Sequence, residues 1–402
     1  MRAWIATTGL DKAGICRAAI AAIVAGGAAA PAMAQVPIPD SSIAGSVTLA
    51  AVIGLLAAIP GLALLATARA TGEAVAGVAT RAIAATAGIA LLWAVIGFTL
   101  ANAPGTAIIG GLGYVLLGGQ PDMGVVLIEL ALALAAGGIV AQAGGARAGF
   151  GWSSVVAIAW VLLVYVPISW WARGEGWLAN FGALDAGGGL TLHLSAGVSA
   201  LVLSRIARPA STDGSAVPIN VMAATIGGAL VWIGLLALIA GTAAAADSDM
   251  AGSVTNGLVA ASAGALVWLG IDRIRTGVAN PLSALLGGVA GIAAVSAGAI
   301  YIGVAGAIIA GGLAGGIGAV IAGADGRRTA FATHGIGGAV GAALLAFLFL
   351  PVLGGPGYEA GATVFNAFTA EMIAVAAVVL WSAIVSLVIG YAVATVLPAT
   401  GD

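Results

Sequence analysis

Long apolar stretches, separated by short polar segments, repeat along almost the whole chain. Eleven of them are long enough to cross a hydrocarbon layer of roughly 30 Å as helices. They cover residues 43–68, 82–103, 122–144, 152–172, 188–204, 217–243, 251–270, 277–296, 298–321, 331–352 and 370–398. The pattern predicts an all-α polytopic membrane protein with eleven transmembrane helices. Its softest boundary lies near Ser296, where two apolar stretches meet with no charged residue between them.

The composition agrees with this interpretation. Hydrophobic residues make up 61% of the 402 residues and charged residues only 7%, which is more apolar surface than a soluble core buries. The 64 glycines predict tight helix packing, because small residues let helix backbones approach closely in lipid. Cys16 is the only cysteine, and no metal-ligand cluster, phosphate loop or nucleophile–base pair is evident. We therefore expect no metal, no cofactor, no nucleic-acid partner and no enzymatic activity.

The N-terminus has the pattern of a secretory signal peptide. A weakly basic region precedes an apolar run over residues 18–30, and Ala32, Met33 and Ala34 form an A-x-A cleavage site. We expect residues 1–34 to be removed, leaving a membrane domain over 35–402 that begins outside the cell.

The distribution of arginine predicts the orientation. With the mature N-terminus outside, the segments around 69–81, 145–151, 205–213, 272–276 and 322–330 are cytoplasmic. They hold nine arginines: Arg69, Arg81, Arg147, Arg205, Arg208, Arg273, Arg275, Arg327 and Arg328. The opposite segments hold only Arg173. This follows the positive-inside rule and predicts a multi-pass protein of the cell (inner) membrane with its C-terminus in the cytoplasm.

The only two histidines occupy the fifth and tenth predicted spans. His193 and His334 each lie a few residues into an apolar helix, and these helices run in opposite directions because they are five spans apart. This spacing predicts two inverted five-helix repeats, about 43–207 and 217–352, followed by a last helix at about 370–398, with the histidines meeting near the membrane midplane. The alternative is that each imidazole only bonds a neighbouring hydroxyl and stabilises packing.

A histidine pair in a dry lumen has a definite chemistry. A bare cation entering such a lumen faces a large desolvation penalty, which a neutral solute avoids. Two adjacent imidazoles share one proton and resist double protonation, so they stay mostly neutral. Such a pair can exchange hydrogen bonds with a small polar solute and relay a proton.

Two motifs resemble those of the ammonium transporter, methylammonium permease and Rhesus protein family. They are "DAGGGLTLHLSAG", which contains His193, and "FATHGIGGAVGA", which contains His334; further similarity lies in "IPGLALLATARA", "LLWAVIGFTLA" and "YVPISWW". The resemblance implies a homotrimer with one narrow hydrophobic pore in each subunit. Ammonium is then recruited outside, loses its proton and passes as ammonia along the histidines. The family also implies that Asp185 supports the outer recruitment site, although a simple helix cap explains this carboxylate equally well.

This chain departs from the family at the outer end of the pore. The positions of two gating phenylalanines fall on Leu132 and Leu238, and the serine of the cation site falls on Thr242. The tryptophan of that site falls near Arg173, with Trp171 among the neighbouring tryptophans. An arginine there repels ammonium, and a cation site built on aromatic faces is weakened.

Two carboxylates in or near the spans add to this picture. Glu129 lies one turn before the Leu132 position and either attracts a cation, pairs with Arg173, or is a protonated acid bonded between helices. Glu371 is expected to be an interfacial residue that begins the last span.

These features favour a channel or transporter for ammonium, ammonia or a small amine. The alternatives are a Rhesus-like conduit for neutral gas, ammonia or carbon dioxide, and a non-conducting ammonium sensor or scaffold. Only "PATGD" follows the last predicted helix in this sequence, so binding of a regulatory protein through a cytoplasmic tail is not expected.

Overall fold

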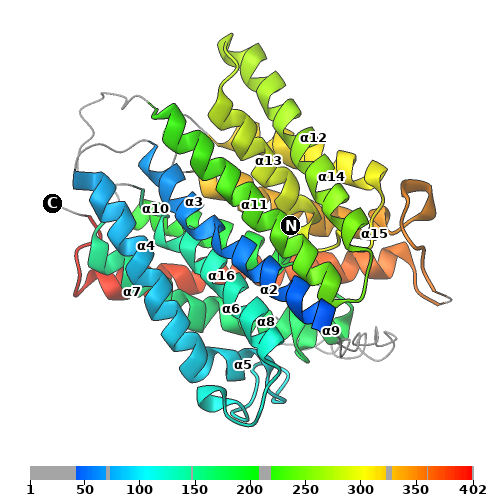
Figure 1. The fold of residues 1–402 in the computed structure, drawn as a ribbon, viewed down its shortest axis with the longest axis horizontal. Helices are drawn as coiled ribbons and strands as arrows, with labels where there is room; N and C mark the ends of the chain where they lie inside the picture. Colours follow the sequence, from blue (N-terminus) through cyan, green and yellow to red (C-terminus); the bar gives the residue numbers. More distant parts are fainter. Residues whose placement is uncertain are drawn as a thin grey trace, which may run out of the picture.

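The computed structural model describes residues 42–68, 73–145, 148–207, 219–322, 328–359 and 361–400, and these residues form helices joined by loops (Figure 1). The α-helices are α2 (Ser42–Leu56), α3 (Ala58–Thr67), α4 (Glu73–Leu92), α5 (Phe98–Asn102), α6 (Met123–Ala141), α7 (Phe150–Trp160), α8 (Val166–Arg173), α9 (Trp177–Phe181), α10 (Ser195–Ile206), α11 (Val221–Ala245), α12 (Met250–Thr276), α13 (Pro281–Ser296), α14 (Val304–Ile321), α15 (Ile336–Leu348) and α16 (Val364–Ala394). The predicted signal peptide, 1–34, lies outside the described residues.

The helices confirm an all-α membrane architecture. Within the described ranges, ten helical stretches are long and apolar enough to cross a bilayer. The eighth predicted span corresponds to α13, which is apolar but has only 16 residues, equivalent to about 24 Å of helix. Eleven crossings therefore remain a prediction.

Several helices extend beyond the apolar stretches that predicted them. The helix α4 begins at Glu73 instead of 82, and α12 continues to Thr276 instead of 270. Backbone hydrogen bonding continues through polar residues at the membrane surface, where hydropathy no longer marks the helix. The prediction that Arg81, Arg273 and Arg275 lie in polar segments between helices was consequently wrong, because all three lie within these helices, and Arg205 likewise lies within α10.

Arg81 is fully buried and joins two parts of the chain. Its guanidinium donates to Gln142 Oε1 at 2.9 Å, to Gly145 O at 2.7 Å and to Ala148 O at 3.0 Å. These bonds hold the connection between α6 and α7 against α4, so this charged side chain contributes to packing.

The boundary near Ser296 is resolved by a turn. The helix α13 ends at Ser296, and α14 begins only at Val304. The helix α13 starts at Pro281 instead of 277. Asn280 Oδ1 accepts from the backbone N–H of Leu282 at 2.9 Å and caps the helix there.

The helices form one packed assembly in which α11 lies alongside α2 and α3, and α12 lies against α13 and α14 (Figure 1). The long helix α16 contacts α7, α10 and α15, and therefore touches both predicted repeats. Glycine permits the closest approach: a Cβ on Gly61 of α3 would meet the carbonyl oxygen of Gly227 of α11 at 2.8 Å. This agrees with the tight packing expected from composition.

Candidate functional site

Both histidines lie on π-helical segments that begin their helices. His193 belongs to η5 (Gly189–Leu194), which continues into α10, and His334 belongs to η6 (Phe331–Gly335), which continues into α15. The packing is reciprocal, since α10 contacts η6 and α15 contacts η5. A π-helical turn widens the helix and often accompanies a functional site. The hydropathy pattern held no signal for it.

The structure brings the two imidazoles together. His193 Nδ1 and His334 Nδ1 are 2.9 Å apart, within hydrogen-bond distance, and the side chains are 0% and 4% exposed. The ring planes differ by only 6° and the ring centroids are 5.1 Å apart. Rings that share a short Nδ1–Nδ1 contact at this centroid distance meet edge to edge. A single proton between the two nitrogens completes the bond.

Ser296, at the end of α13, is a third member of this site. Its Oγ lies 3.1 Å from His193 Nε2 and donates to the backbone carbonyl of Ile292 at 2.8 Å. Sequence reasoning treated Ser296 only as a span boundary. Its position at the end of an apolar helix was the one available signal, but the contact joins residues 103 positions apart.

Glycine makes the histidine pair possible. A Cβ on Gly197 would collide with the backbone of Gly335 and with the carbonyl carbon of His334. Because these are backbone atoms, they cannot yield as a flexible side chain does. The two helices reach the 2.9 Å nitrogen contact only with a bare backbone at this position.

Gly197→Ala is therefore expected to separate the two histidine-bearing helices. Overpacking of this kind costs roughly 1–3 kcal/mol, and loss of the Nδ1–Nδ1 bond should reduce transport. Gly270→Ala is the matched control, because a Cβ at this helical position has nothing within 4 Å. Thermal unfolding of the purified variants measures the difference. Equal melting temperatures for Gly197→Ala and Gly270→Ala would contradict the interpretation.

Asp185 caps the first histidine segment. Its carboxylate oxygens accept from the backbone N–H groups of Leu190 and Thr191, each at 2.9 Å, where the positive end of the helix favours an anion. Burial raises the pKa of Asp185, while the nearby Arg173 guanidinium and these two N–H donors oppose that rise. The Asp185 carboxylate thus holds the start of η5 in place. It lies five residues before Leu190 and six before Thr191 in the sequence.

Arg173 forms a buried ion pair with Glu129. The distance between Arg173 Nη2 and Glu129 Oε1 is 2.5 Å, and the side chains are 13% and 9% exposed. Arg173 Nη1 also donates to the carbonyls of Asp185 at 3.0 Å and Ala186 at 2.7 Å. The pair connects α6, α8 and the loop before His193. Of the three interpretations of Glu129 given above, the structure therefore supports the one in which Glu129 pairs with Arg173.

Several polar atoms in this region are buried without a hydrogen-bond partner among the described residues. They include Glu129 Oε2, Arg173 Nε, Tyr165 Oη and Thr191 Oγ1. An unpaired buried polar atom is costly, so a water molecule or a small polar solute would be favoured beside them.

The remaining candidates for the outer site make separate contacts of their own. Leu132 is fully buried and lies near Gly188, at the start of η5, and Leu238 of α11 is buried. The hydroxyl of Thr242 donates to carbonyls of its own helix, Leu238 O at 3.1 Å and Ile239 O at 3.0 Å. Trp171 donates to Ile108 O at 2.7 Å and packs edge-on against Trp381 of α16. Neither Thr242 nor Trp171 bonds the Arg173–Glu129 pair.

Glu371 is buried and does not begin the last helix, contrary to expectation. It is 2% exposed and accepts from the backbone N–H of Leu184 at 2.8 Å. The helix α16 begins at Val364, which places Glu371 about two turns inside the helix. The last helix thereby holds the loop that carries Asp185.

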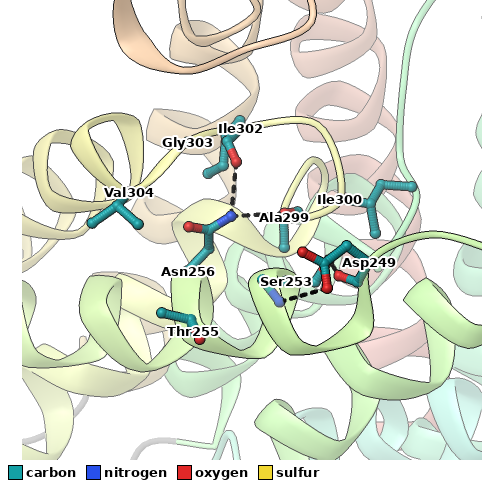
Figure 2. Close-up of a pocket in the computed structure, with 10 residues that line it drawn as sticks. Asp249, Ser253, Thr255, Asn256, Ala299, Ile300, Ile302, Gly303 and Val304 are labelled. Carbon is teal, nitrogen blue, oxygen red and sulfur yellow. Dashed lines mark hydrogen bonds between the residues drawn. The ribbon is translucent and has the colours of Figure 1, made fainter.

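A separate pocket of about 290 Å³ lies at the start of α12 (Figure 2). Its polar side chains are engaged in the fold: Asn256 Nδ2 donates to Ala299 O at 3.2 Å and to Ile302 O at 2.7 Å, and Asp249 accepts from Gly252 N–H at 3.0 Å. The Asn256 bonds secure the turn between α13 and α14, and the Asp249 bond caps α12. Within the described ranges, no group of three or more His, Cys, Asp and Glu side chains is placed to hold a metal ion.

Comparison with known proteins identifies the family. The sequence model of the Ammonium Transporter Family matches residues 46–398. The chain is similar to the ammonium transporter Amt1 of Archaeoglobus fulgidus (30% identity, covering 75% of this chain and 80% of that one) and to an ammonium transporter of Bacillus subtilis (32% identity, covering 47% and 49%). The fold resembles a structure described as a sensor Amt protein, with a TM-score of 0.81 and 19% identity over 90% of this chain and 95% of that one. The chain belongs to the ammonium transporter family, whose members are transporters or channels and not enzymes.

Proposed function

We propose that this protein conducts ammonium or ammonia, and small amines such as methylamine, through a narrow pore lined by His193 and His334. The observation that carries the proposal is the buried Nδ1–Nδ1 contact of 2.9 Å between two helices far apart in the sequence. If the imidazoles only stabilised packing, each would need no more than a neighbouring hydroxyl, whereas here His193 and His334 also bond each other.

The proposed topology has eleven crossings, with two inverted five-helix repeats and a final helix, in the cell (inner) membrane. The mature N-terminus lies outside after signal-peptide cleavage, the C-terminus lies in the cytoplasm, and the functional unit is a homotrimer with one pore in each subunit. Reciprocal packing of α10 on η6 and α15 on η5 supports the inverted repeats, because a two-fold relation requires such symmetry.

Passage depends on the solute being neutral where the lumen is dry. Ammonium is recruited at the outer end near Asp185 and Glu129, gives up its proton to water there, and continues as ammonia along the imidazoles. Neutral ammonia avoids the desolvation penalty of an ion. The histidine nitrogens replace part of the hydrogen bonding that the molecule loses on leaving water.

A second candidate is a conduit for neutral gas, either ammonia or carbon dioxide. Arg173 favours it, since its guanidinium already neutralises Glu129 at 2.5 Å and adds a repulsive charge where a cation would enter. Leu132 and Leu238 provide aliphatic surface at the gate positions, and aliphatic groups lack the aromatic faces that attract cations.

Recordings on a solid-supported membrane distinguish these functions. Liposomes containing the purified protein are exposed to a step in ammonium concentration. Electrogenic ammonium transport gives a current, whereas ammonia conduction gives only a change in internal pH. A response to carbon dioxide alone would favour the gas conduit. If the folded protein gives neither a current nor a pH change in any of these assays, the proposal of conduction is wrong and the non-conducting sensor or scaffold remains.

A further inference from the structure

The hydrogen bonds around the histidine pair have a determined direction. Ser296 Oγ and Ile292 O are 2.8 Å apart. A carbonyl oxygen carries no proton, so the serine proton must lie between these two oxygens. The Ser296 oxygen is then an acceptor toward His193 Nε2, 3.1 Å away.

The proton on His193 follows from this. If Ser296 accepts from Nε2, a neutral His193 carries its proton on Nε2 and has a bare Nδ1. Across the 2.9 Å contact, His334 Nδ1 must be the donor. A neutral His334 then has its lone pair on Nε2, for which no hydrogen-bond partner occurs among the described residues.

We propose that Ser296 fixes the tautomers of the pair, so that His334 Nε2 is its only free basic nitrogen. Ser296 acts as a positioning residue, through His193. A solute N–H donor meets a lone pair at His334 and an occupied N–H at His193, so the two otherwise similar histidines are functionally unequal. A proton accepted by the pair enters at His334 Nε2, and the Nδ1 proton shifts to His193. The consequence for transport rests on the proposed function, but the tautomer assignment does not.

The hydroxyls of Ser195 and Thr333, close to the two histidines in the sequence, are occupied and leave this assignment intact. Ser195 Oγ donates to Thr191 O, and Thr333 Oγ1 donates to Thr329 O at 2.9 Å. Thr191 Oγ1 makes no hydrogen bond among the described residues, so it bonds neither imidazole. Among the described residues, no hydrogen bond or ion pair joins a charged side chain to either imidazole.

Solid-state NMR of ¹⁵N-histidine-labelled protein in bilayers tests the proposal, because the chain has only two histidines. They follow different residues, Leu192 and Thr333, so ¹³C labelling of leucine alone assigns His193. The expected spectrum has His193 protonated at Nε2 and His334 protonated at Nδ1. The reverse assignment would overturn the proposal.

Ser296→Ala removes the acceptor and should shift the tautomer ratio at least roughly fivefold toward the reverse arrangement, as expected for the loss of one hydrogen bond. Ser296→Thr should restore the original ratio. Ser199→Ala is the matched control, because this buried serine bonds Trp160 Nε1 at 2.8 Å and no imidazole. An unchanged ratio in Ser296→Ala would also overturn the proposal. The spectrum can be recorded on a protein that conducts nothing, so failure of the proposed function gives a different result.

Discussion

His193→Ala and His334→Ala are each expected to change the passage of ammonia or its selectivity by about tenfold or more without unfolding the protein. Each substitution removes one imidazole from the 2.9 Å pair and with it hydrogen bonds to the permeating solute. A loss near 1.4 kcal/mol corresponds to a tenfold change. The measurement is the ammonium-dependent current or internal pH change in liposomes, with size-exclusion chromatography to confirm assembly.

Ile389→Ala is the control for the cavity that a large-to-small substitution leaves, because Ile389 is a buried residue of α16 outside the histidine pair. It should conduct like the unmodified protein. Unaltered rate and selectivity in both histidine variants would remove the pair from the pathway and restore the packing interpretation.

Glu129→Gln is expected to destabilise the protein strongly. It leaves the Arg173 guanidinium in a site where its side chain is only 13% exposed and where its other partners, Asp185 O and Ala186 O, are neutral. Removing one partner of a buried ion pair costs about 3–5 kcal/mol. Thermal unfolding in detergent measures the effect.

The double variant Glu129→Gln with Arg173→Met separates pairing from packing. It should be more stable than Glu129→Gln alone, because no buried charge is left uncompensated. A double variant whose loss equals the sum of the two single losses would show that the pair is not coupled. The double variant also tests the second function, since ammonium current should rise if Arg173 is what repels the cation.

The helices were largely predictable, and their ends were not. Apolar length identified the long helices, because a span across lipid must satisfy all backbone groups internally, but not the short helix α9 between two of them. At the membrane surface this constraint ends. Arg81 and Glu371 were therefore misplaced: each lies inside a helix that continues through polar residues, and each is buried by contacts with distant segments.

The site was predictable in part for a similar reason. His193 and His334 stand out because they are the only histidines, and an inverted repeat places equivalent positions together. Ser296 and the choice among the readings of Glu129 had no local signal. Each depends on a contact between helices, and side-chain direction at such a contact is set by packing.

By itself, the sequence determined the membrane class of the protein, its apolar helices and the two histidines that define its candidate pore, because hydropathy and the rarity of ionisable residues in lipid are properties of composition. Only the tertiary structure decided that the imidazoles meet through Nδ1 with Ser296 behind one of them, and that Glu129 is neutralised by Arg173. These outcomes depend on the approach of separate helices to within hydrogen-bond distance, which glycine permits but no linear pattern specifies.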